Sequence, residues 1–213
     1  MVGSLLQTGG LSERDAFWLV RQLVRREGEY GLDRLYAPGL PLLMHWLGLL
    51  ELALAASLPA LWAHLRRLDI GASFFATPWF VTLFCSTKCL CGAAVRWAWD
   101  QLLLARAGKG AATLMVLSVA LAILRQVECE IELGVTDFEG TMAALQTCGG
   151  RFKAEAHCSS EAEARRQEAA ACALLQGHVA AVGLSARKVA SWEKQLAKMQ
   201  RQKLKKTERE EGR

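Results

Sequence analysis

Three thiols stand close together in the segment CSTKCLC, at Cys85, Cys89 and Cys91, and closely spaced thiols are common ligands of structural zinc. A zinc site needs four ligands, which are usually supplied as two separated pairs. In this sequence no second pair of Cys or His follows at zinc-site spacing. The pattern therefore predicts free thiols and no metal site.

Two other kinds of residue could carry chemistry. The segment GKG at 108–110 lacks both the upstream glycine of GxxxxGK and a Ser or Thr after the lysine, so we interpret it as a linker between helices. His45 and His64 lie in apolar segments, where a hydrogen-bonded histidine at the core or its rim is commoner than a ligand or base. No Ser/His/Asp or Cys/His set is identifiable. The sequence predicts no catalytic centre and no cofactor.

The elements that must position these residues are predicted to be helices. Only four prolines occur, the last of them at Pro78, and Ala and Leu dominate over β-branched residues. Ser12 begins a capping box, Thr77 followed by Pro78 predicts the start of another helix, and Thr136 begins a second capping box. We expect an all-α fold of about eight packed helices, including an apolar helix over 111–127.

Composition divides the chain near Gly149. Residues 1–149 are predicted to form the main domain, and residues 150–213 an Ala/Glu-rich and then basic helical tail. From residue 187 onward there are ten Lys or Arg and four Glu, a balance of +6, so the remaining residues carry 16 basic and 17 acidic groups, a balance of −1. The basic character therefore belongs to the tail and does not indicate a nucleic-acid-binding fold.

The basic tail carries several lysines that could contact acidic lipid head groups or RNA. A simple solvated helix is the favoured interpretation, peripheral membrane contact stays open, and no nucleic-acid partner is expected. The lysines concerned are Lys198, Lys203, Lys205 and Lys206.

The seven cysteines are odd in number and irregular in spacing, and residues 1–10 lack the basic n-region of a signal peptide. We therefore expect reduced thiols in a cytoplasmic protein.

Two apolar stretches are candidates for a membrane span. Residues 40–63 include His45, Glu51 and two prolines, and residues 111–124 are shorter than the roughly 20 needed to cross the hydrocarbon core. A core helix is favoured, and a membrane-associated helical protein remains the minor alternative.

Five segments, in order, resemble the TBC domain, the fold of GTPase-activating proteins for Rab GTPases. They are DAFW at 15–18, LPAL with HL at 58–65, FATPWFVTLF at 75–84, WD at 99–100 and VALAIL at 119–124. The third is the most specific. The positions that match the family's scaffold are Phe17, Trp18, Pro59, His64, Trp79, Phe80, Phe84, Trp99 and Asp100.

The resemblance implies a regulator of Rab-type GTPases in vesicle traffic, cytoplasmic and peripheral on endomembranes. Family members supply an arginine from IxxDxxR and a glutamine from YxQG, and neither motif occurs in this sequence. The start, MVGSLL, resembles the residues just after YxQG, so we expect a truncated domain. The family's motif is RxWD, whereas Arg96 here is followed by two residues before Trp99, so Arg96 is one residue out of the family's register. Arg14, Arg21, Arg25 and Arg26 are interpreted as a solvated face rather than substitutes.

We therefore expect a family member that is not itself an enzyme and that is catalytically inactive as this chain. A non-catalytic helical interaction module is the alternative. Trp79 and Phe80 are predicted to be buried, together with Leu83. Apolar helix faces without cover are expected to cause self-association, either at Phe17, Leu23 and Val24 or at Leu42, Leu49 and Leu52.

Overall fold

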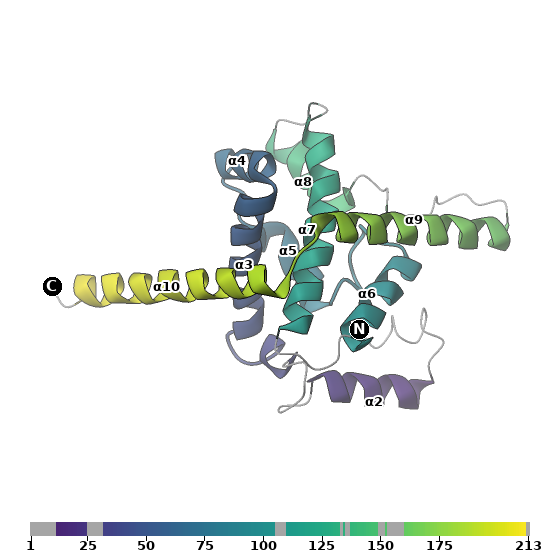
Figure 1. Ribbon diagram of the computed structural model, residues 1–213, viewed down its shortest axis with the longest axis horizontal. Coiled ribbons are helices and arrows are strands. Elements are labelled where there is room, and N and C mark those ends of the chain that lie inside the picture. The colour runs from purple at the N-terminus through teal and green to yellow at the C-terminus, as the bar shows by residue number, and fades with distance from the viewer. Residues whose placement is uncertain are drawn as a thin grey trace.

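The computed structural model describes residues 12–24, 32–104, 110–132, 134, 137–148, 152 and 160–211. Those residues form nine α-helices and one 3₁₀-helix and contain no strand, which confirms the all-α prediction (Figure 1). The elements are α2 (Glu13–Val24), η1 (Leu32–Leu35), α3 (Pro41–Ser57), α4 (Pro59–Arg67), α5 (Ala72–Val81), α6 (Gly92–Leu104), α7 (Ala111–Glu132), α8 (Phe138–Thr147), α9 (Glu161–Val182) and α10 (Ala186–Glu211).

Helix α7 lies at the centre of the fold and packs against α3, α4, α6, α8, α9 and α10. Every residue over 115–124 is buried. The apolar segment at residues 111–124 was predicted from the sequence to be too short for a membrane span. The segment Ala112–Ile131 is long and apolar enough to cross a membrane. Two bent pairs, α3 with α4 and α9 with α10, meet the same criteria only if each pair is taken as one span. Because 78% of the apolar window of α7 is buried inside the protein, its apolar surface is covered by the chain's own helices.

Two helix starts follow the predicted capping chemistry, one of them shifted by a residue. The Ser12 hydroxyl oxygen accepts from the Asp15 backbone N–H at 3.2 Å and donates to the Asp15 carboxylate at 2.6 Å. At α8 the cap is Asp137, whose carboxylate accepts from the Gly140 N–H at 3.1 Å. Thr136 lies outside the described residues. A carboxylate at this position satisfies an orphan N–H and faces the positive end of the helix.

The predicted helix start at Thr77 and Pro78 is wrong, because α5 begins at Ala72 and runs through both residues. The Thr77 hydroxyl donates to the Ser73 carbonyl at 2.8 Å, as in a helix interior. The apolar run before Thr77 buries Phe75 and Ala76, and this packing outweighs the hydrogen bond that Pro78 cannot make. The helix ends soon afterwards, at Val81.

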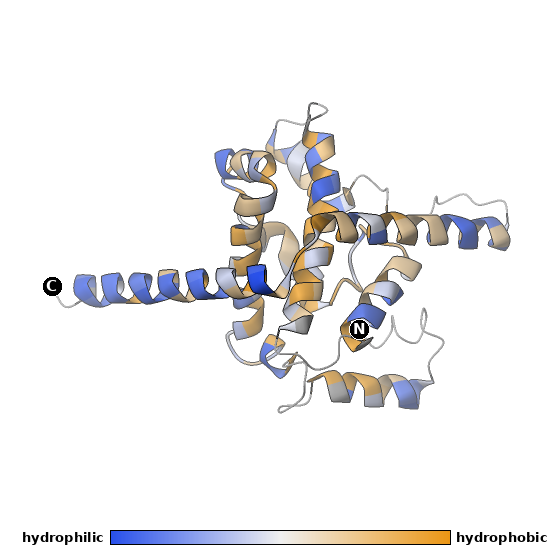
Figure 2. Cartoon of the chain, in the orientation of Figure 1, coloured by the Kyte–Doolittle hydropathy of each residue, from blue (hydrophilic) through white to orange (hydrophobic). Residues whose placement is uncertain are grey.

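The segment after residue 149 packs on the helices before it. Helix α9 lies against α6 and α7, and α10 against α3 and α7. The Phe152 carbonyl accepts from the Cys91 N–H at 2.7 Å, and the Phe152 side chain is fully buried. The division into residues 1–149 and 150–213 stays a prediction. In Figure 1 the C-terminal part of α10 extends beyond the body of the protein, and Figure 2 shows that this part is hydrophilic.

Candidate functional site

The most specific motif, FATPWFVTLF, builds an aromatic cluster at the centre of the fold. Trp79, Phe80 and Phe84 are buried, which confirms the prediction for the first two. Phe80 meets the ring of Trp46 from α3 at a centroid distance of 5.9 Å and that of Phe84 at 6.3 Å, both edge to face. Phe75 meets Trp79 at 5.4 Å in the same manner. Edge-to-face pairs align the ring quadrupoles, so the motif fixes α5 against α3.

Trp99 connects this motif to α6. Its indole N–H donates to the carbonyl of Leu83 at 3.0 Å in a buried position. Leu83 and Phe84 have φ values of 48° and 66°, a left-handed backbone that residues with a Cβ seldom adopt. The Phe84 N–H closes the turn by donating to the Trp79 carbonyl at 2.7 Å. Two motifs that stand apart in the sequence therefore meet at one strained turn. Leu83 is buried, as predicted.

His64 belongs to a hydrogen-bonded network between α4 and α8, as the sequence predicted for a rim histidine. The Arg67 guanidinium donates to Nδ1 at 3.1 Å, so Nε2 carries the proton and donates to the Thr141 hydroxyl at 2.8 Å. That hydroxyl in turn donates to the Asp137 carbonyl at 2.7 Å. Burial, and then the charge of Arg67, lowers the pKa of His64. These partners give His64 a structural role in joining two helices.

Pro59 and Asp100 lie away from the buried cluster. Pro59 is the first residue of α4 and is exposed, as is common for proline where the missing N–H would have no partner. Asp100 is exposed on α6, directly after the buried Trp99. The WD pair therefore has its aromatic member in the core and its carboxylate at the surface.

Helix α2 presents two of the motif aromatics to solvent. Phe17 is 59% exposed and Trp18 46% exposed, and their rings meet edge to face at 5.8 Å. The Arg21 guanidinium lies 4.8 Å from the centroid of the Trp18 ring. The α2 face that was expected to lack cover is thus exposed at Phe17 but not at Leu23, because the core-facing positions of this helix are Ala16 and Leu23, both fully buried.

The second apolar face that was expected to lack cover is largely covered. Leu42 and Leu49 are buried and Leu52 is half-buried, because η1, α5, α7 and α10 all pack on α3. On α2, Leu23 is also covered and Val24 is half-buried. The exposed apolar surface of α2 is therefore concentrated at its two aromatic residues.

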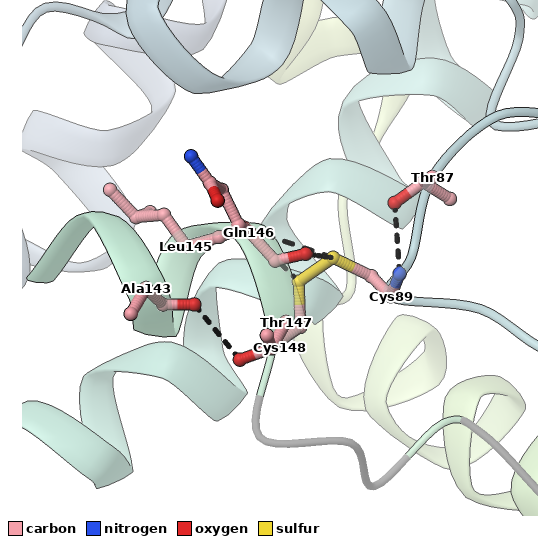
Figure 3. Close-up of a disulfide and its surroundings, with 7 residues drawn as sticks. All are labelled: Thr87, Cys89, Ala143, Leu145, Gln146, Thr147 and Cys148. Atoms are coloured by element: carbon pink, nitrogen blue, oxygen red, sulfur yellow. Dashed lines mark hydrogen bonds between the residues drawn. A yellow bond between two sulfur atoms is a disulfide. The ribbon is translucent and has the colours of Figure 1, made fainter. Parts of the chain in front are cut away.

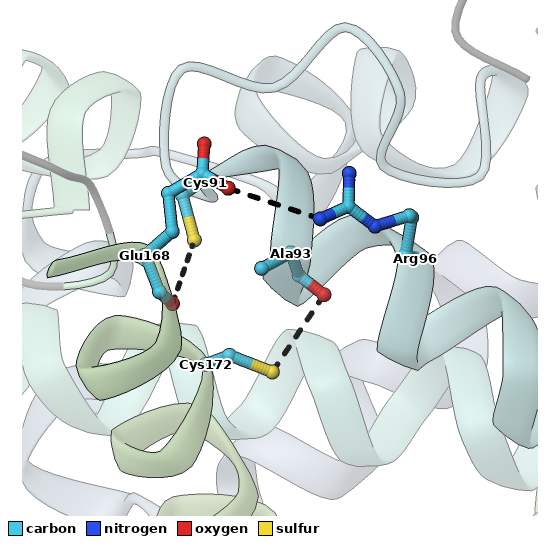
Figure 4. A network of polar contacts seen from close by, with 5 residues as sticks. All are labelled: Cys91, Ala93, Arg96, Glu168 and Cys172. Carbon is cyan, nitrogen blue, oxygen red and sulfur yellow. Dashed lines mark hydrogen bonds and ion pairs between the residues drawn. The ribbon is translucent and has the colours of Figure 1, made fainter. Parts of the chain in front are cut away.

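The structure describes three of the arginines that were considered in the sequence: Arg14, Arg21 and Arg96. Arg14 is exposed on α2, and Arg25 and Arg26 lie outside the described residues. Arg96 on α6 forms an ion pair with Glu168 on α9 at 3.8 Å (Figure 4). Arg21 rests on Trp18. Arg96 therefore helps to hold α9 on α6, a contact with a segment that the resemblance did not cover.

The expectation that all thiols are free is wrong for one pair. Cys89, in the segment between α5 and α6, forms a disulfide with Cys148, which ends α8 (Figure 3). The Cα atoms are 5.1 Å apart, within the range for disulfides. The Cys89 N–H also donates to the Thr87 hydroxyl at 3.0 Å. The two cysteines are separated by 59 residues, so only tertiary packing reveals the pair.

Two further thiols lie at the junction of α6 and α9. The buried Cys91 thiol donates to the Glu168 carbonyl and the buried Cys172 thiol to the Ala93 carbonyl, each at 3.6 Å (Figure 4). Burial raises the pKa of Cys91, so its protonated form is favoured. Within the described ranges, no group of three or more Cys, His, Asp or Glu is placed to hold a metal ion.

The residues described above include every segment that resembles the TBC domain. A model of the Rab-GTPase-TBC domain family matches residues 1–132, which is more than half of the 213-residue chain. The chain therefore belongs to the Rab-GTPase-TBC domain family. It is also similar to the GTPase-activating protein GYP5 of Eremothecium gossypii, with 40% identity over 72 residues, or 34% of this chain and 8% of that protein. The chain thus matches less than a tenth of that relative's length.

Proposed function

We propose that this 213-residue chain binds a Rab-type GTPase through its TBC scaffold and does not accelerate GTP hydrolysis. The observation that carries the proposal is a contrast within the sequence. The scaffold motifs are present, and two of them place Trp79, Phe80 and Trp99 in the core, whereas the arginine motif IxxDxxR and the glutamine motif YxQG do not occur in the chain. Binding depends on the scaffold's surface, and catalysis depends on the two missing side chains.

The physical chemistry of the reaction explains why this contrast matters. Charge spreads over the oxygens of the transferring phosphoryl group, and a supplied arginine stabilises that charge, while a glutamine orients the attacking water. The arginine alone contributes about 10³ to 10⁵ in rate. Such stabilisation requires a donor that is already aimed at the phosphate. Arg21 lies on Trp18 and Arg96 pairs with Glu168, so each makes a contact within its own chain.

The exposed aromatic face of α2 is our candidate for the contact with the GTPase. Aromatic residues and arginine are enriched at the centres of protein interfaces. Phe17, Trp18 and Arg21 provide two aromatic rings and one guanidinium on neighbouring positions of α2. The Phe17–Trp18 contact holds both rings in one arrangement before a partner arrives. Less side-chain entropy is then lost on binding.

Single-turnover GTP hydrolysis across a panel of Rab GTPases tests the catalytic half of this proposal. We expect the rate with the chain to equal the intrinsic rate, while calorimetry or interferometry detects binding to at least one GTP-loaded Rab. An acceleration of a hundredfold or more that disappears with Arg14→Ala or Arg21→Ala would contradict it. Fusion of a family N-terminal half that carries both missing side chains should raise the rate.

A matched pair of variants tests the contact surface. Phe17→Ala should weaken Rab binding by about tenfold or more, as expected for an aromatic anchor. Phe74→Ala on α5 is the control, because Phe74 is 60% exposed and Phe17 is 59% exposed. Equal effects of the two changes would argue against α2 as the contact.

Self-association is a second proposal for the same face, since an exposed aromatic pair also favours contact between copies. Sedimentation velocity over a range of concentrations should show a dimer that Phe17→Ala converts to monomer. A monomer at all concentrations would remove this proposal and leave the GTPase contact untouched.

The proposed location is the cytoplasm, with peripheral attachment to endomembranes. Cytosolic proteins seldom keep structural disulfides, so the Cys89–Cys148 pair reports on the compartment. Rapid alkylation of intact cells followed by mass spectrometry should label both thiols, because a reducing cytoplasm opens the disulfide that the oxidised protein carries. An intact disulfide in cells would argue for an oxidising compartment instead.

A small membrane-associated helical protein is the alternative, since α7 is long and apolar enough to cross a membrane. The burial of its apolar window within the fold favours a core helix. Alkaline carbonate washing of membranes separates the alternatives, because a peripheral protein is released and a spanning one is retained.

A further inference from the structure

Helix α10 carries an uninterrupted block of positive charge. Residues 194–206 contain six Lys or Arg and no Asp or Glu. The part of the chain from residue 187 onward has a balance of +6, whereas the rest has a balance of −1. The protein's charge asymmetry is therefore concentrated on a single helix.

Five of the cations lie in one line along α10. At about 100° per residue, the spacings of 7, 4, 3 and 4 place them within an arc of about 60°, and they extend over about 27 Å. All five are exposed, and four of them line one open hollow on the surface. We call this set the basic stripe; it consists of Arg187, Lys194, Lys198, Arg201 and Lys205.

The opposite side of α10 fixes the direction in which the basic stripe points. Val189, Trp192 and Leu196 are buried, and they stand about 180° around the helix from the stripe. A Cβ added to Gly48 of α3 would lie 2.9 Å from Leu196 Cδ1, so the two helices are in close contact. The stripe therefore faces away from the body, and beyond Leu196 every described side chain of α10 is exposed.

The charge of the basic stripe is not offset nearby. Among the described side chains, no carboxylate lies within ion-pair distance of its five cations. The acidic residue on the docked half, Glu193, is directed to α3, where it lies 3.7 Å from His45 Nε2. The surface therefore presents positive charge to any anionic partner.

We propose that the basic stripe docks the protein on an anionic lipid surface. Runs of four to eight Lys or Arg on a surface helix bind acidic head groups, and such a surface needs no fixed register with the protein. Lysine is depleted at protein–protein interfaces. Single-stranded nucleic acid is held largely by stacking on aromatic rings, and Trp192, the aromatic residue of α10, is buried. A lipid surface is thus the partner that this chemistry fits.

Co-sedimentation of the full chain with vesicles tests the inference. Binding should occur to phosphatidylcholine vesicles that contain phosphatidylserine and not to phosphatidylcholine alone, and it should weaken steeply with added salt. Each cation near the surface raises the partition coefficient about fivefold. The double variant Lys198→Gln/Arg201→Gln should therefore lower it about 25-fold.

A second double variant provides the control. Lys203 and Lys206 are exposed on other sides of the same helix, about 170° and about 110° from the middle of the stripe. Lys203→Gln/Lys206→Gln removes the same charge from positions farther from the lipid by about one Debye length, so it should lower binding less than about fivefold. Circular dichroism should confirm that both variants keep their helix content.

Three results would overturn the inference. They are equal losses for the two double variants, equal binding to vesicles with and without phosphatidylserine, or tighter binding to a single-stranded RNA than to vesicles at the same salt. Rab binding by Lys198→Gln/Arg201→Gln is expected to be unchanged, because the inference does not rest on the GTPase contact.

Discussion

Replacing Trp99 by phenylalanine removes the indole N–H that reaches the Leu83 carbonyl and keeps an aromatic ring in place. Leu83 is 1% exposed, so water does not readily replace the lost donor. An unsatisfied buried carbonyl costs about 1–3 kcal/mol, and the smaller ring loses about 1 kcal/mol of packing. We expect the free energy of unfolding to fall by about 2–4 kcal/mol, which corresponds to a Tm lower by about 4–16 °C for a chain of this size.

Urea unfolding followed by far-UV circular dichroism measures this change without relying on tryptophan fluorescence. Trp97→Phe is the matched control, because Trp97 lies two residues earlier on α6 and is half-buried. It should lower the free energy of unfolding by about 1 kcal/mol or less. Equal losses for the two variants would refute the reasoning that the hydrogen bond holds the left-handed turn.

Three further predictions address other parts of the fold. Cys148→Ser should lower the free energy of unfolding of the oxidised protein by about 2–4 kcal/mol, because the disulfide closes a long loop, whereas Cys129→Ser at an exposed free thiol should change it little. Gly48→Ala should change the free energy of unfolding by about 1 kcal/mol or less, because its Cβ would lie 2.9 Å from the movable end of Leu196 while alanine favours the interior of α3, and amide exchange should rise chiefly in α10. The pKa of His64 is lowered in the folded state from 6.5, so below that pH the unfolded state binds more protons and stability falls as the pH falls. His64→Gln should flatten this decline in denaturation curves measured across that range.

The sequence predicted much of the fold because its signals are local. The capping serine before α2, the apolar composition of α7 and the polar composition of α10 each depend on neighbouring residues alone. Family membership followed from short motifs in the right order. These signals were sufficient to place Trp79 and Phe80 in the core.

The errors arose where distant packing competes with a local rule. Threonine followed by proline is a common helix start. Helix α5 nevertheless begins earlier, at Ala72, because the burial of Phe75 favours a helix in the residues before Pro78. Leu23 was expected on the same uncovered face as Phe17, yet it is buried, because Ala16 and Leu23 occupy the core-facing side of α2. Periodicity fixes which residues share a face, but the helices packed around α2 decide which face is buried.

Helices of the C-terminal segment pack against the helices of the family match in this chain. Residues that match the family model end at 132, yet α9 packs on α6 and α7, and α10 packs on α3 and α7. Arg96, which is out of the family's register, pairs with Glu168 of α9, and Leu196 of α10 packs onto Gly48. The motif helices therefore share one hydrophobic core with helices outside the matched range. Loosening α9 or α10 should consequently expose apolar surface of α3 and α7, so the tail contributes to the stability of the scaffold as well as to its charge.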